Sequence, residues 1–307
     1  MTGVVAAFVA LVSVAVLGYL VGAGGLLRAA DELVLSRLAF FVATPALMFA
    51  TVSRADLGTL ASPVLLTEVV AVVCVQAGYV VAARLLWRRD RRELTVGALA
   101  SSYVNAGNLG IPISIYVLGD GALVAPILLV QLIVLTPAAF LVLDRGARSV
   151  RSALLLPLRN PLTVASLLGL ACALAGLRLP APLMRPIDLL GGAAVPVALL
   201  AYGLSLYGSR GAPPAEERPG VRGELALVVV LKSAVQPALA YAAARFALGL
   251  EGRALLAATL LAALPTAQNI YVYAVTYDTG RRLARGAVLT TTTLSIPIMA
   301  AIAALLG

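Results

Sequence analysis

Apolar stretches of eighteen or more residues recur along the whole of this 307-residue chain, and they leave little choice of fold. A stretch of that length crosses the hydrocarbon core of a bilayer as a helix, because a helix satisfies its own backbone hydrogen bonds there. Charged residues make up only 12% of the chain, about half the fraction found in soluble domains. The sequence therefore predicts an all-α polytopic membrane protein.

The hydrophobic pattern predicts ten transmembrane helices. They are expected at residues 4–22, 33–53, 62–86, 94–119, 122–143, 160–177, 186–207, 224–249, 254–278 and 284–306. No basic region precedes the first stretch, so we expect a helix that is retained rather than a cleaved signal.

The distribution of arginine predicts how the helices are oriented. Seventeen arginines fall in the loops on one side of the predicted bundle and five on the other. Because basic loops stay in the cytoplasm, both termini are expected outside it. The net charge of +9 is thus a topology signal and not a nucleic-acid-binding patch. The bias toward Ala, Arg, Gly and Pro indicates a bacterial protein, which we expect in the plasma membrane.

The two halves of the chain resemble each other at a shift of 160 residues. "VQAGYVVAARLL" (75–86) matches "VQPALAYAAARFAL" (235–248), which pairs Gln76 with Gln236, and Asn108 falls opposite Gln268. Five helices in each half would enter the membrane from opposite sides. We therefore expect two inverted five-helix repeats, residues 1–143 and 160–307, joined by a cytoplasmic linker at 144–159. Such repeats are typical of secondary transporters.

Two of the predicted helices carry residues that interrupt a helix. "SSYVNAGNLGIP" (101–112) breaks the fourth at Asn105–Pro112, and "LPTAQN" (264–269) breaks the ninth. Interrupted helices at matching positions of two repeats indicate a transporter binding site, because half-helix N-termini attract anions. The alternative is a plain proline kink with amides that pack helices together. The candidate substrate-binding residues on these segments are Asn105, Asn108, Gly110, Pro112, Pro265, Gln268 and Asn269.

These segments also carry a family resemblance. "NAGNLGIPISIYVLGDG" resembles a segment of the auxin efflux carrier family, and "GGAAVPVALLAYGLSL" (191–206) and "LKSAVQPALA" (231–240) are similar to its seventh and eighth helices. The resemblance implies the bile-acid-symporter-like fold, in which helices 1, 2, 6 and 7 form a panel domain. Helices 3–5 and 8–10 form a core domain, where helices 4 and 9 cross beside the substrate. "PTAQN" (265–269) departs from the pattern of the plant members of that family.

Two charged residues fall inside predicted helices. Lys232 enters from the cytoplasmic end and is a further candidate for substrate binding, with snorkelling to the surface as the alternative. Glu68 enters from the outer end, and we consider it, with Gln76 and Gln236, for coupling or support. The opposite depths of Lys232 and Glu68 argue against direct pairing.

A secondary carrier for a small organic anion is the function these features favour. An ion-coupled symporter of the bile-acid and sodium type, a channel and an intramembrane enzyme are the alternatives. An enzyme would need a catalytic set, and the chain has no histidine and no paired acidic motif. For the same reason we expect no metal or other cofactor. The expected partners are the anionic substrate and the lipid bilayer, with a homodimer left open.

Overall fold

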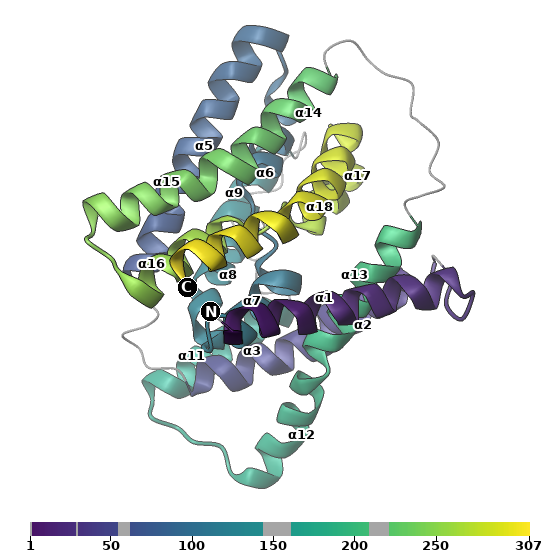
Figure 1. The fold of residues 1–307 in the computed structure, drawn as a ribbon, viewed down its shortest axis with the longest axis vertical. Coiled ribbons are helices and arrows are strands. Elements are labelled where there is room, and N and C mark those ends of the chain that lie inside the picture. Colours follow the sequence, from purple (N-terminus) through teal and green to yellow (C-terminus); the bar gives the residue numbers. More distant parts are fainter. Residues whose placement is uncertain (1, 29, 55–61, 144–160, 209–220) are drawn as a thin grey trace.

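The computed structural model describes residues 2–28, 30–54, 62–143, 161–208 and 221–307 (Figure 1). These residues are nearly all helical, and their only bridge of β type is an isolated one. An all-helical fold is therefore confirmed for this part of the chain. The predicted linker at 144–159 lies outside the described residues.

Helices coincide with each of the ten predicted apolar segments. In the first half they are α1 (Thr2–Ala23), α2 (Asp31–Leu38), α3 (Thr44–Ser53), α5 (Pro63–Trp87), α6 (Arg91–Ser102), α7 (Ile111–Tyr116), α8 (Ala125–Val130) and α9 (Thr136–Leu143). In the second half they are α11 (Pro161–Leu174), α12 (Ala181–Gly192), α13 (Ala194–Gly208), α14 (Val221–Val230), α15 (Gln236–Ala242), α16 (Gly252–Ala262), α17 (Gln268–Thr276) and α18 (Arg281–Leu306). Short π-helical turns join α2 to α3, α8 to α9 and α14 to α15.

Five of these helical stretches are long and apolar enough to cross a membrane. They are Asp31–Ser53, Pro63–Trp87, Ala181–Gly208, Arg222–Ala247 and Arg281–Leu306. Shorter apolar helices account for other predicted segments, among them 121–130 and 252–262. The membrane character of the chain is thus supported, whereas the full set of ten crossings and the inverted repeat remain predictions.

The described helices pack in two groups (Figure 1). α1 lies along α13, and α11 and α12 lie against α3; we call α1–α3 and α11–α13 the panel helices. α5 packs on α6, α15 and α16, and α18 packs on α14, α16 and α17; we call α5–α9 and α14–α18 the core helices. The grouping follows the helices that the family resemblance assigns to panel and core.

Small residues bring the panel helices close together. A Cβ atom added at Gly203 of α13 would lie 1.8 Å from the carbonyl oxygen of Ala15 in α1, and one at Gly18 would lie 2.3 Å from that of Leu200. Only glycine allows two helix backbones to approach this far, as is common in membranes. The panel helices therefore pack as a closely fitted unit.

A buried ionic cluster joins two core helices near one end. Glu224 of α14 is 3% exposed, and its carboxylate accepts hydrogen bonds from the Tyr79 hydroxyl of α5 at 2.6 Å and from Arg89 Nε at 2.9 Å. A buried carboxylate needs such partners. The cluster fixes α14 against α5. Glu68 lies in α5, and α14 leads into the π-helical turn that contains Lys232.

Candidate functional site

The two interrupted helices cross, and their interrupted segments pair with each other. α6 ends at Ser102 and α16 ends at Ala262, and the residues that follow, 103–105 and 263–267, are not helical. Val104 and Thr266 form an antiparallel bridge, in which Asn105 N donates to Pro265 O at 2.8 Å and Ala267 N donates to Tyr103 O at 3.0 Å. Each break therefore satisfies backbone groups that the other leaves free, which non-helical backbone at this depth requires.

Side chains from neighbouring helices satisfy further backbone groups of the crossing. Gln131 Nε2 donates to Val104 O at 2.9 Å, and Thr266 N donates to the Thr291 hydroxyl at 3.0 Å. The Thr266 hydroxyl donates in turn to Ala100 O at 2.6 Å. All three side chains are buried. The sequence analysis missed them, because a single Gln or Thr in an apolar helix carries no pattern that identifies its backbone partner.

The break in the first half lies earlier than predicted. It was expected at Asn105–Pro112, whereas the non-helical residues are Tyr103–Asn105, and a π-helical turn, Ala106–Gly110, leads directly into α7. Pro112 follows this turn as the second residue of α7, so it lies within the half-helix that begins at Ala106 and does not mark the break. The carbonyl of Asn105 accepts hydrogen bonds from Leu109 N and Gly110 N at 3.2 and 3.0 Å.

The candidate residues of the second break lie where a half-helix begins. Pro265 is non-helical, and Gln268 and Asn269 are the first two residues of α17, both partly exposed. Gly110 brings the two breaks together, because an added Cβ would lie 3.0 Å from the Leu264 side chain and 2.9 Å from Val124. The side chain of Asn108 lies outside what the structure describes.

On the other side of the crossing, polar side chains cap the C-terminal ends of the half-helices. Lys232 Nζ donates to Ala262 O at 2.9 Å and to Gln236 Oε1 at 2.8 Å. Gln236 Nε2 donates to Ser102 O at 3.0 Å and to Glu68 Oε1 at 3.1 Å. Cations and donors are favourable at this end of a helix, where carbonyl groups are unpaired.

The fold therefore brings together charges that the sequence analysis kept apart. Lys232 is 1% exposed and Glu68 is 3% exposed, and Gln236 bonds to both. The alternative that Lys232 snorkels to the surface is wrong, because the residue is buried. Among the described residues Lys232 and Glu68 form no direct ion pair, and Gln236 lies between them. Gln76 joins the same group, because its amide donates to the Ser102 hydroxyl at 3.0 Å.

A small pocket opens on the crossing between the core and a panel helix. Its volume is about 20 Å³, which is room for about one water molecule. Phe40 comes from the panel side, and the polar residues at its wall include Asn105, Gln131 and Asn269. Lys232 does not line it. A carboxylate would fit here only after the panel and core helices move apart.

Comparison with known proteins extends over nearly the whole chain. A family model described as "Membrane transport protein" matches residues 3–303. A protein of Rhizobium meliloti named "Putative malonate transporter" is 28% identical over 267 residues, which are 83% of this chain and 81% of that protein. An "Uncharacterized transporter" of Methanothermobacter thermautotrophicus is 31% identical over 202 residues, 62% of this chain and 64% of its own length. The family match includes both interrupted helices.

Proposed function

This chain belongs to the membrane transport protein family, that of the auxin efflux carriers, and from that premise we propose that it is a secondary carrier for a small organic anion. The names of the family and of its relatives indicate a transporter rather than an enzyme. We place it in a bacterial plasma membrane with both termini outside the cytoplasm, as the arginine distribution predicts.

The crossing of the two interrupted helices is the observation that carries this proposal. At Val104 and Thr266 the paired segments leave two half-helices that begin beside the small pocket: α17, and the π-helical turn Ala106–Gly110 that leads into α7. The N-terminus of a half-helix presents unpaired N–H groups and partial positive charge, which favour a carboxylate. Asn105 and Asn269 add amide groups from the two breaks at the pocket wall.

Mono- and dicarboxylates are the substrate class that fits these donors. The relative named for malonate transport makes malonate the first compound to test. The small volume of the pocket supports a mechanism of alternating access, in which the site closes between two open states. The buried apolar cluster at the crossing joins core residues such as Val104 and Leu264 to the panel residues Met48 and Val195. This contact would open as the core helices move relative to the panel helices.

Uptake by the purified protein in proteoliposomes tests this function. The panel of solutes comprises malonate, succinate, acetate and the neutral diamide of malonate, with proton and sodium gradients imposed independently. We expect saturable uptake and counterflow of at least one carboxylate and none of the diamide. Flux that does not saturate would indicate a channel, and transport of the neutral compound alone would refute the anion assignment.

Coupling to an ion is the alternative that a specific observation favours. Glu68 Oε2 is buried and has no hydrogen-bond partner within the described part of the chain, so this oxygen could take a proton or face a small cation. In the same proteoliposomes, Glu68→Gln would then lose the response to an imposed gradient and keep counterflow. An unchanged gradient response in Glu68→Gln would exclude this carboxyl as the coupling group.

A further inference from the structure

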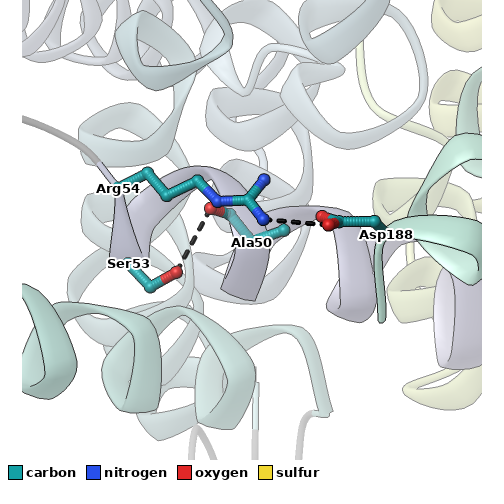
Figure 2. Close-up of polar contacts among 4 residues, drawn as sticks. All are labelled: Ala50, Ser53, Arg54 and Asp188. Carbon is teal, nitrogen blue, oxygen red and sulfur yellow. Dashed lines mark hydrogen bonds and ion pairs between the residues drawn. The ribbon is translucent and has the colours of Figure 1, made fainter. Parts of the chain in front are cut away.

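An ion pair joins two panel helices at one end of the molecule. Figure 2 shows the Arg54 side chain, at the C-terminal end of α3, extending past Ala50 to Asp188 of α12. Arg54 Nη2 lies 2.9 Å from Asp188 Oδ2, and the two side chains are 56% and 42% exposed. Exposed ion pairs contribute little to stability, so Arg54 can change partners at low cost.

Two cavities meet at this pair. The larger, about 680 Å³, is also lined by Cys172, Arg178 and Arg185. The smaller, about 310 Å³, is lined by panel residues of α3 and α12 and by Asp120 from the core. Both volumes are in the range of small-molecule sites. Arg54 and Asp188 line both cavities and so mark the boundary between them.

The larger cavity is basic and has unused donors. Among its described lining residues are three arginines and one aspartate. Arg178 and Arg185 make no hydrogen bond or ion pair within the described chain, and Arg54 makes its single side-chain hydrogen bond to Asp188. That bond raises the pKa of Arg54 above its ordinary value, which keeps it charged. A guanidinium has further N–H groups that suit a second carboxylate.

The smaller cavity leads from this pair toward the crossing. Phe40 lines the pocket at the crossing, Leu47 lines the smaller cavity, and Arg54 ends the same helical stretch. Fourteen residues of helix span about 21 Å. Residues at the two ends of this panel helix therefore line the pocket at the crossing and the basic cavity.

We propose that the larger cavity captures the carboxylate substrate before it reaches the crossing, and that Arg54 exchanges the Asp188 carboxylate for that of the ligand. The inference rests on the proposed function, since it takes the captured anion to be the transported one. The positive charges of Arg178 and Arg185 raise the local concentration of the anion. When the anion leaves, the ion pair between Arg54 and Asp188 forms again.

Cys172 provides a reporter for this cavity that requires no transport. Changing Cys74 to Ser leaves Cys172 as the one thiol of the chain. The protein in detergent is treated with an anionic methanethiosulfonate, which carries a sulfonate, and with its cationic trimethylammonium analogue. The quantity measured is the rate with the anionic reagent divided by the rate with the cationic reagent. We expect this ratio to be about tenfold higher at Cys172 than for a free thiol in solution. We also expect excess succinate to slow the reaction.

Variants of the cavity distinguish capture from general exposure. Arg54→Gln and Arg178→Gln should each reduce the preference for the anionic reagent severalfold, and Arg54→Gln should also remove the protection by succinate. Asp188→Asn should increase both the preference for the anionic reagent and the protection by succinate. Arg245→Gln is the matched control, because Arg245 also forms an exposed ion pair, with Glu251, but lines neither cavity. Equal rates for the two reagents, absent protection, or an equal effect of Arg245→Gln would overturn the proposal.

Transport kinetics separate this proposal from the proposed function. For a carboxylate that the wild type transports, Arg54→Gln should raise KM severalfold with kcat unchanged, because capture precedes the movement of the core. If no carboxylate is transported while the labelling preference and protection persist, the capture site stands and the carrier function fails. If transport proceeds with unchanged KM in Arg54→Gln, the carrier function stands and the capture site is refuted.

Discussion

At the scale of single residues, Lys232 shows how a charge becomes part of a membrane interior. Its ammonium group replaces water with the Ala262 carbonyl and the Gln236 amide oxygen, and Gln236 also contacts Glu68. Such a buried group stabilises the fold only as long as its partners remain. The cluster supports the ends of both half-helices, so we expect Lys232 to position the crossing rather than bind substrate directly.

Removing Lys232 should therefore destabilise the protein. Lys232→Met leaves two acceptors without a donor and Glu68 without a neighbouring cation, and we expect a loss of about 3–5 kcal/mol in the free energy of unfolding. Unfolding in detergent, followed by circular dichroism, measures it. Adding Glu68→Gln to Lys232→Met should recover part of the loss. Additive effects of the two changes would show that the side chains act independently.

Asn269 allows the candidate substrate contacts to be tested apart from folding. It is partly exposed at the start of α17 and lines the pocket at the crossing. We expect Asn269→Ala, and likewise Asn108→Ala at the other break, to reduce carboxylate uptake at least about tenfold, as a lost polar contact to substrate would. Unfolding temperatures close to wild type are the control. Wild-type uptake by the folded double variant would remove both residues from the site.

At the scale of secondary-structure elements, close helix approach fixes the panel. The backbones of α1 and α13 meet where Gly203 faces Ala15, and no side chain fits between them. The core differs, because its two central helices are interrupted and are held by hydrogen bonds between the interrupted segments. The described contacts within the panel thus rest on close glycine packing, and those at the centre of the core rest on hydrogen bonds at the crossing.

Alanine at Gly203 should show how much the α1–α13 contact contributes. The added Cβ would lie 1.8 Å from the Ala15 oxygen, so the helices must separate, and overpacking of this kind costs about 1–3 kcal/mol. Gly78→Ala is the matched control, since nothing lies within 4 Å of a Cβ there, and it should stabilise α5 by about 0.5–1 kcal/mol. Unfolding in detergent compares them; equal effects would mean that α1 and α13 are not tightly packed.

At the scale of the whole molecule, the contact between panel and core decides whether the protein is a moving carrier or a rigid pore. Core residue Gly121 lies against panel residue Thr51, with an added Cβ 3.4 Å from the Thr51 methyl group. This separation is compatible with a disulfide between cysteines at the two positions. The pair therefore offers a way to fix the two groups of helices in the arrangement of Figure 1.

Oxidation of a Thr51→Cys/Gly121→Cys variant, made with both native cysteines replaced by serine, should stop transport. A reducing agent should restore it. The control crosslink, Val52→Cys/Gly169→Cys, lies within the panel, where the Cβ atoms are 3.2 Å apart, and it should leave transport intact. Uptake that continues through the oxidised panel–core disulfide would favour a rigid pore.

The orientation of the whole molecule is tested at its C-terminus. With an even number of crossings and the observed arginine distribution, Gly307 should face away from the cytoplasm. Alkaline phosphatase fused after Gly307 should then be active in a bacterial host, and green fluorescent protein fused there should be dark. The opposite pair of results would mean that one crossing has been miscounted, and the inverted repeat would fail with it.

The sequence by itself determined the properties that depend on local composition. Long apolar stretches are sufficient to predict helices in a membrane, and clustered Asn, Gly and Pro are sufficient to predict that two of these helices are interrupted, because neither inference needs a distant partner. The ends of α6 and α16, at Ser102 and Ala262, even preserve the shift of 160 residues.

Only the tertiary structure decided how the interruptions are satisfied. The non-helical residues lie at Tyr103–Asn105, and not at Pro112, because Pro265 and Ala267 of the other break supply the backbone partners there. The same holds for Gln131 at the crossing and for the group of Lys232, Gln236 and Glu68. A buried polar group takes whichever partner the fold places within hydrogen-bonding distance, and that partner lies far away in the sequence.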